Sequence, residues 1–386
     1  MGTRRWVNEG DDDMADRKRI SRASRTALAA ALVVAVLGLV PGRAEAFYIP
    51  KPSAVLVSKT SSQVTVIVNG LRKDLKLQPT AQVIHFSAGS DPYVNYAFLY
   101  NPGAGKDGVL RYWVSGGKIQ TSFKEFPVSG RYRPFAYGGG IFWYAPGAAS
   151  DSIWKFNADA TSYTSTPQDV RGDFTPVWWQ SRMCCDSVKT TSALIWYDPG
   201  PQPDMMWIFD GKGGHTVKPL TINGTYRPLY GQFVLDGTYE ASDVLWYSQD
   251  GPEYVWSPTS DVTEWASYKV GDIGPGARPV VGSYRTDPIG QDSSTVLWYR
   301  PGPQAETYWL GGPGTGPNHT MAASPAGQIN GDYRPLAYGY HDVLLLGAGT
   351  TGQIAHFTDA GLTGTIKLTG LPANATGESS YLNFHA

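Results

Sequence analysis

Four acidic residues stand at matching places in the 386-residue chain and are the first candidates for acid/base chemistry. Asp151, Asp204 and Glu306 each follow a tyrosine by seven positions, and Glu253 follows its tyrosine by six. Paired carboxylates can act as general acid and general base. A residue that recurs in every unit is more simply a requirement of the fold, such as an acceptor for backbone N–H groups in a turn. We therefore predict a structural role for all four and name no catalytic residue.

Other signatures of catalysis or metal binding are scarce. No G-x-S-x-G elbow, P-loop or H-E-x-x-H pattern occurs. The histidines show no metal-ligand spacing; they are His85, His215, His319, His341, His356 and His385. We expect His85 and His356 to be ordinary strand residues, since each lies within a short apolar run.

Aromatic residues that belong to one part of the chain are the candidates for binding. Trp178 and Trp179 are adjacent and lie beside a long segment between two predicted strands. Together with Tyr230 and Tyr239 they form our predicted exposed aromatic surface. Such a surface can stack on sugars or fill pockets of a protein partner.

The only two cysteines are the neighbours Cys184 and Cys185. In an exported protein an even pair suggests a disulfide. Adjacent cysteines can bond each other only through a strained ring, which makes the bond easier to reduce. We expect a disulfide between these neighbours that stiffens the long segment; bridges to another molecule, or two free thiols, stay open as alternatives.

One hairpin pattern is written several times and must position all these residues. It is an apolar-Trp-Tyr run, a Pro-Gly turn, an acidic residue and a return tryptophan. Full copies are Ile141–Trp154, Leu194–Trp207 and Val296–Trp309, a copy with one residue deleted is Val244–Trp256, and weaker copies are Phe98–Leu110, which contains Asp107, and Val343–His356. We expect the recurrent tryptophans to pack between units; they are Trp154, Trp207, Trp256 and Trp309.

The repeat predicts an all-β fold. Most copies are preceded by an Arg-Pro pair and a short apolar run, so each unit offers about four short strands in roughly 50 residues, which is typical of a β-propeller blade. A β-sandwich would not require near-constant spacing of one pattern. The six copies predict six blades of four strands, and the strand-like runs within 47–80 together with Tyr381–Phe384 would add a seventh. We favour seven blades, with the last one closed by both termini and with residues 81–386 carrying the repeats.

The repeat frame resembles the FG-GAP/VCBS-type repeats of secreted bacterial proteins and the integrin α-chain propeller. It matches in the aromatic-Arg-Pro element, the Gly-aromatic pair, and the Leu-Trp-Tyr-x-Pro-Gly and acidic-x-x-Trp elements. The resemblance implies calcium sites in Asp-rich loops between the first two strands of a blade. Here those loops lack closely spaced acids, and calcium requires six to eight oxygen ligands. Asp236 and Asp243 are the best remnant of such a site; otherwise we expect no cofactor.

Residues 1–46 are typical of an export signal. Basic residues precede the apolar run Ala27 to Val40, and Ala44-Glu45-Ala46 provides a cleavage site. Met14 gives a better start than Met1, because the acidic run before it is unusual in a signal. The apolar run is shorter than the roughly 20 residues of a membrane span, so we expect no span after cleavage, with an uncleaved anchor as the alternative. The net charge of −1 gives no indication of a nucleic-acid partner.

These observations predict a secreted or cell-surface binding or adhesion module for a polysaccharide or a surface protein. The segments 177–192, 230–243 and 281–295, which differ between units, would carry specificity. One alternative is an extracellular carbohydrate-active enzyme, a lyase or a hydrolase, with its site at the mouth of the central channel. A second alternative is a structural protein that self-associates. The oligomeric state and the ligand are left open by the sequence.

Overall fold

Antiparallel strands make up the described part of the protein. The chain divides into two units, Met1–Ile49 and Pro50–Ala386. The computed structural model describes residues 52–89, 91–103, 106–147, 150–183, 191–200, 202–210, 214–233, 239–241, 243–258, 262, 264–284, 294–311 and 321–379, with 180–183, 191, 239–241 and 322 described by their backbone only. The predicted export signal lies outside these residues, and all that follows concerns the second unit. Within the described residues no helix has the length and apolar character needed to cross a membrane.

In six of the seven sheets the four blade strands come from one repeat unit; only β17 (Tyr239–Ala241), between the first two strands of blade 5, pairs with blade 4 instead. Blade 2 contains β4 (Gln82–Phe86), β5 (Val94–Tyr100), β6 (Gly108–Ser115) and β7 (Lys118–Glu125). Blade 3 contains β8 (Arg133–Tyr137), β9 (Gly140–Tyr144), β10 (Asp151–Phe156) and β11 (Tyr163–Gln168). Blade 4 contains β12 (Thr175–Met183), β13 (Thr191–Tyr197), β14 (Asp204–Phe209) and β15 (His215–Leu220).

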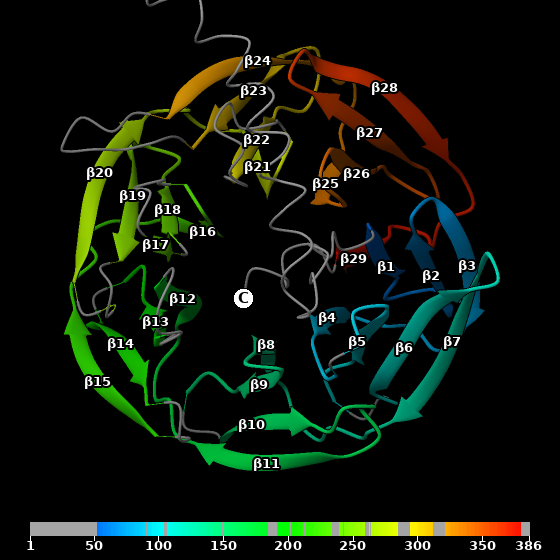
Figure 1. The fold of residues 1–386 in the computed structure, drawn as a ribbon, viewed down its shortest axis with the longest axis horizontal. Coiled ribbons are helices and arrows are strands. Elements are labelled where there is room, and N and C mark those ends of the chain that lie inside the picture. Colours follow the sequence, from blue (N-terminus) through cyan, green and yellow to red (C-terminus); the bar gives the residue numbers. More distant parts are fainter. Residues whose placement is uncertain are drawn as a thin grey trace, which may run out of the picture. The chain divides into compact units, whose positions relative to one another are not determined.

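The later blades repeat this order. Blade 5 contains β16 (Arg227–Gly231), β18 (Asp243–Tyr247), β19 (Glu253–Pro258) and β20 (Trp265–Gly271). Blade 6 contains β21 (Arg278–Gly282), β22 (Thr295–Tyr299), β23 (Ala305–Leu310) and β24 (Ala322–Gln328). Blade 7 contains β25 (Arg334–Ala337), β26 (Asp342–Leu346), β27 (Gly352–Thr358) and β28 (Gly361–Leu368). Figure 1 shows the first strand of each of blades 2 to 7 next to the centre of the ring and the last strand at the rim.

Blade 1 combines strands from both ends of the described chain. It contains β1 (Ser53–Val57), β2 (Gln63–Val68), β3 (Leu71–Lys76) and β29 (Thr376–Ser379). β29 is its inner strand and pairs antiparallel with β1. The predicted count of seven and the closure by N- and C-terminal strands are confirmed. The closing strand comes earlier than the predicted Tyr381–Phe384, which lies outside the described residues. The sequence did not indicate β29, because its residues Thr-Gly-Glu-Ser are polar and show no apolar strand pattern.

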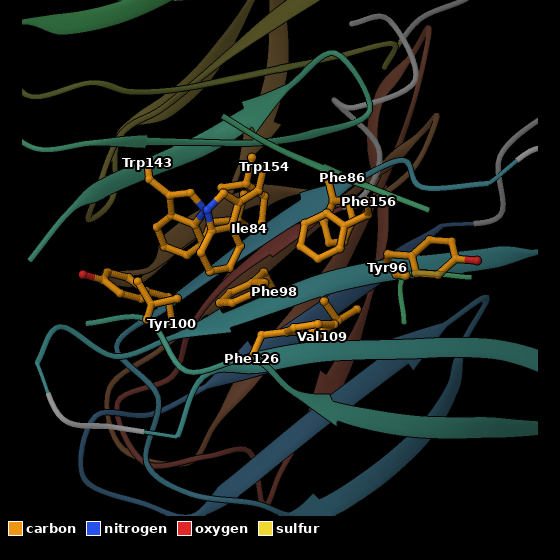
Figure 2. Packing of buried hydrophobic residues seen from close by; sticks show 13 residues of the cluster. Ile84, Phe86, Tyr96, Phe98, Tyr100, Val109, Phe126, Trp143, Trp154 and Phe156 are labelled. Carbon is orange, nitrogen blue, oxygen red and sulfur yellow. The ribbon is translucent and has the colours of Figure 1, made fainter. Parts of the chain in front are cut away.

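Seven hydrophobic clusters, one at each interface between neighbouring blades, form the core. Between blades 2 and 3, the buried Trp143 lies edge-on to Phe98, with ring centroids 5.1 Å apart, and to Tyr100 at 5.3 Å. Figure 2 shows Trp143 and Trp154 of blade 3 side by side above these two rings. Trp154 is 8% exposed, Trp207 3% and Trp309 5%. The predicted packing of the recurrent tryptophans is therefore confirmed for these three.

In blades 2 to 6 the tyrosine of the hairpin pattern binds the segment that leads to the next blade. The Tyr144 hydroxyl donates to the Gly172 carbonyl at 2.8 Å and accepts from the Phe174 N–H at 2.8 Å. The Pro-Gly turn contributes to the same contact, because the Gly147 N–H also donates to the Gly172 carbonyl. Gly172 has a positive φ of 140°, a conformation that glycine adopts at little cost. Equivalent tyrosine contacts to the next connecting segment occur at Tyr100, Tyr197, Tyr247 and Tyr299.

Candidate binding cleft between blades 4 and 5

The recurrent acids act on the backbone, as predicted. Asp204 accepts from the N–H groups of Asp198 at 2.8 Å and of Ile222 at 2.6 Å. It thus ties the turn after the second strand to the segment after the fourth. Asp107 and Asp151 accept two N–H groups in the same way. All three carboxyl groups are buried, so they are held inside the scaffold.

Burial shifts the protonation of most of these carboxyl groups. Burial raises the pKa of Glu253 to about 7, although the Ile273 N–H lowers it. Burial also raises the pKa of Glu306 to about 7, against the lowering effect of the Ile329 N–H. A buried charge is unfavourable unless hydrogen bonds compensate it. These shifts are explained by the scaffold and give no evidence of catalysis.

The prediction that Trp178 and Trp179 share one exposed aromatic surface is wrong, because Trp179 is buried and Trp178 faces another blade. Trp179 is 0% exposed and packs against Trp265 of blade 5, with ring centroids 5.7 Å apart. Trp178 is partly buried and lies edge-on to Tyr137 of blade 3 at 5.2 Å. Successive side chains of a strand point to opposite faces of the sheet. Two adjacent tryptophans on β12 therefore face two different neighbouring blades and cannot share one surface.

The remaining predicted site residues are placed only in part. Tyr230 lies on β16 and is partly buried. Tyr239 belongs to the short strand β17 (Tyr239–Ala241), whose backbone pairs with the end of β12 and makes a fifth strand beside blade 4. Cys184, Cys185 and Asp236 lie outside the described residues.

Asp243, the other half of the predicted calcium remnant, is used by the backbone. It is buried and accepts from the Phe233 N–H at 2.6 Å. Within the described residues no group of three or more His, Cys, Asp or Glu side chains is arranged to hold a metal ion. The calcium prediction itself stays open, because Asp236 is not among those residues.

A cleft of about 280 Å³ lies between blades 4 and 5. Its residues come from the segment that joins the two blades and from the three outer strands of blade 5. They are Thr221, Ile222, Asn223, Tyr226, Trp246, Tyr254, Trp256 and Ser267. None of these side chains carries a formal charge, so the cleft is lined by aromatic faces, hydroxyl groups and one amide.

The scaffold fixes the aromatic walls of this cleft. Trp246 is 1% exposed and lies edge-on to Trp256, with centroids 5.2 Å apart. Trp256 also stacks on Trp265, with centroids 4.9 Å apart and an interplanar angle of 20°. Tyr226 lies edge-on to Trp246 at 6.1 Å. Burial raises the pKa of the Tyr226 phenol, and Tyr254, which lines the same cleft, raises it further.

Two features of blade 5 depart from the repeat at this place. Trp256 is only partly buried, whereas the tryptophans at the same position of blades 3, 4 and 6 are at most 8% exposed. Tyr254 follows the recurrent acid directly, where blades 3, 4 and 6 have Ser152, Met205 and Thr307. The cleft therefore combines repeated scaffold rings with one aromatic ring that blade 5 alone supplies among these four blades.

Sequence reasoning missed Tyr254 and the residues of the joining segment. A signal was present: blade 5 has the hairpin copy with one residue deleted, and Tyr254 lies directly after its acid. Reading the repeats position by position for unmatched aromatics would have selected Tyr254. The contribution of Thr221 and Asn223 depends on how neighbouring blades meet, which no single repeat encodes.

The fold, but no family, is shown by comparison with known proteins. No family model matches the chain, and no curated protein matches its sequence. A protein from Lactobacillus plantarum has a similar structure, with a TM-score of 0.51 and 11% identity over 83% of this chain and 97% of that chain. Apo AztD from Citrobacter koseri is similar with a TM-score of 0.50 and 12% identity over 86% of this chain and 99% of that chain. This protein is a seven-bladed β-propeller. At such identities the likeness shows the fold alone.

Proposed function

We propose that the protein is an exported, non-catalytic binding module that holds a neutral sugar unit of a polysaccharide in the cleft between blades 4 and 5. The observation that carries this proposal is the lining of the cleft. Aromatic rings of Tyr226, Tyr254 and Trp256 meet uncharged polar groups there, and none of the described residues that line the cleft carries a formal charge.

This lining matches the chemistry of a sugar ring. A pyranose has apolar C–H faces, which favour aromatic rings, and hydroxyl groups on its edge, which need hydrogen-bond partners. The hydroxyl groups of Thr221 and Ser267 and the amide of Asn223 supply such partners. A volume of about 280 Å³ is at the small end of ligand sites, which suits one or two sugar units of a longer chain.

Export and family remain part of the proposal. The basic and apolar pattern of residues 1–46 supports secretion or display at the cell surface. The resemblance to FG-GAP/VCBS-type repeat proteins is consistent with that location and stays a prediction. A surface protein as the partner, bound through the long segments between first and second strands, is the other outcome that the binding test below can return.

A second candidate is a carbohydrate-active enzyme with its site in the channel, and one residue favours it. Glu378 is the only acidic residue in the seven inner strands, all of which the structure describes. Burial raises the pKa of Glu378 to about 7, and its carboxylate accepts a hydrogen bond from the backbone N–H of His85 at 2.8 Å. A carboxyl group with that pKa suits general acid catalysis. Glu378→Gln would abolish depolymerisation of a bound polysaccharide if this alternative holds.

The experiment that tests the binding proposal is a screen of the purified protein on an array of neutral and acidic glycans. Binders are then titrated by calorimetry with the wild type, with Tyr254→Ser and with Thr307→Ser. The Tyr254 variant takes the residue of blade 3, and the Thr307 variant changes the same position in blade 6. We expect a neutral glycan whose affinity falls about tenfold in Tyr254→Ser and is unchanged in Thr307→Ser.

Two results would overturn the proposal. One is the absence of any neutral glycan that binds at millimolar concentration. The other is a glycan that binds Tyr254→Ser as well as the wild type, which would place the binding surface elsewhere. Circular dichroism of each variant checks that the fold is intact.

A further inference from the structure

Arginines gather at one end of the inner strands. β8, β16, β21 and β25 each begin with an arginine, namely Arg133, Arg227, Arg278 and Arg334. These positions correspond, because each arginine pairs with the last residue of the second strand of its blade. The inner strands surround the centre of the ring (Figure 1), so the arginines stand around one mouth of it. Glu378 is the only acid that the described inner strands offer in return.

Two of the four arginines are neutralised by a repeated ion pair. Arg133 pairs with Asp173, and Arg278 pairs with Asp332 at 2.6 Å. Each aspartate lies in the segment that leads to the next blade, two residues before its inner strand begins. Arg278 also donates to the Tyr333 carbonyl at 2.5 Å. In these two blades an aspartate of the following segment thus balances the charge of the arginine.

Arg227 and Arg334 have no aspartate at the corresponding position. The positions that would hold their aspartates are Gly276 and Asn374. Within the described part of the chain the side chain of neither arginine makes an ion pair or a hydrogen bond. Both side chains are exposed, so their guanidinium groups are free to meet a ligand.

Arg227 and Arg334 both begin inner strands, in blades 5 and 7, and therefore stand at the same mouth of the ring. Burial lowers the pKa of Arg227, Tyr247 raises it, and the charge of Arg334 lowers it again. Like charges at one mouth of the ring repel each other when no counterion is present, and an anion bound between them would reduce this repulsion.

We propose that Arg227 and Arg334 form an oxyanion site at the mouth of the channel, which binds a carboxylate, sulfate or phosphate group of a ligand. The guanidinium fork matches the geometry of such groups and can make two parallel hydrogen bonds to each. The surplus of positive charge on the inner strands adds long-range attraction for an anion. Arg227 directly follows Tyr226 of the sugar cleft, but neither arginine lines that cleft.

The test is calorimetric titration of the full chain with inorganic sulfate, inorganic phosphate and glucuronate at constant ionic strength. The wild type is compared with Arg227→Gln, Arg334→Gln and the matched control Arg133→Gln, whose arginine already has an aspartate. We expect saturable binding of at least one anion, which weakens about tenfold or more in each of the first two variants. Arg133→Gln should bind as the wild type does. Stronger binding of glucuronate than of the inorganic ions would identify an acidic sugar as the source of the group.

Clear outcomes would contradict the proposal. No saturable binding of any of the three anions by the wild type would overturn it, and so would equal weakening by Arg133→Gln. Arg227→Lys keeps the charge but loses the fork, so it should bind between the wild type and Arg227→Gln. Titration of a neutral glycan should be unaffected by Arg334→Gln, and this keeps failure of the anion site distinct from failure of the sugar cleft.

Discussion

Blades 4 and 5 are neighbours built from the same repeat, yet they use its residues differently. In blade 4 the acid Asp204 accepts two backbone N–H groups, and Trp207 is 3% exposed. In blade 5 the acid comes one residue earlier, and Glu253 accepts from the Ile273 N–H with both of its carboxylate oxygens, at 3.3 and 3.2 Å. There Trp256 is partly exposed and lines a cleft.

The difference teaches where specificity enters a repeat fold. Blade 4 shows what the pattern does when it is complete: each recurrent residue satisfies the backbone or fills an interface. Blade 5 keeps the same tyrosine and tryptophans but has a shorter turn and adds Tyr254. A departure of this size leaves the ring closed and changes one surface between two blades.

The largest contrast is expected from deleting the return tryptophan in each blade. Trp207→Ala removes a buried ring and should lower the free energy of unfolding by about 3–5 kcal/mol. Trp256→Ala removes a partly exposed ring and should cost about half as much, while it abolishes glycan binding. Urea unfolding followed by tryptophan fluorescence measures the first effect and calorimetry the second. Equal destabilisation by both variants would break the comparison.

A smaller contrast is expected from the acids. Asp204→Asn replaces one acceptor oxygen with a donor that faces a backbone N–H, so it should destabilise by about 1–3 kcal/mol. Glu253→Gln keeps an oxygen that can accept from the Ile273 N–H, and it replaces a carboxyl group whose neutral form burial already favours. The free energy of unfolding should therefore fall by less than about 1 kcal/mol. Thermal unfolding midpoints of the two variants decide this, and a larger loss in Glu253→Gln would refute it.

The smallest effect concerns pH. The folded-state pKa values of Glu253 and Glu306 are raised to about 7 from an ordinary 4.5. The stability that these groups contribute is therefore fully present below about pH 4.5 and is lost as pH rises through about 7. The double variant Glu253→Gln, Glu306→Gln should show a smaller decrease in thermal midpoint between pH 5 and pH 8 than the wild type. An unchanged decrease would show that other groups, such as Glu378, account for it.

Much of the scaffold could be predicted from the sequence because the repeat states it several times. The spacing of Tyr144, Tyr197 and Tyr299 to their acids and tryptophans gave the blades, the strand order and the structural role of the acids. The interface partners of single residues could not be read in this way. Trp178 and Trp179 do not form one surface, because adjacent residues of a strand point to opposite faces. The cleft combines Asn223, from the segment after blade 4, with Tyr254 of blade 5.

The central claim is that ligand binds where blade 5 departs from the repeat. Hydroxyl-radical footprinting with mass spectrometry, in the presence and absence of the glycan selected on the array, tests it most directly. We predict that ligand slows the oxidation of Tyr226, Tyr254 and Trp256 and leaves the outer-strand tyrosine Tyr163 of blade 3 unchanged. Protection confined to other blades, with Tyr254 oxidised at its ligand-free rate, would contradict the account.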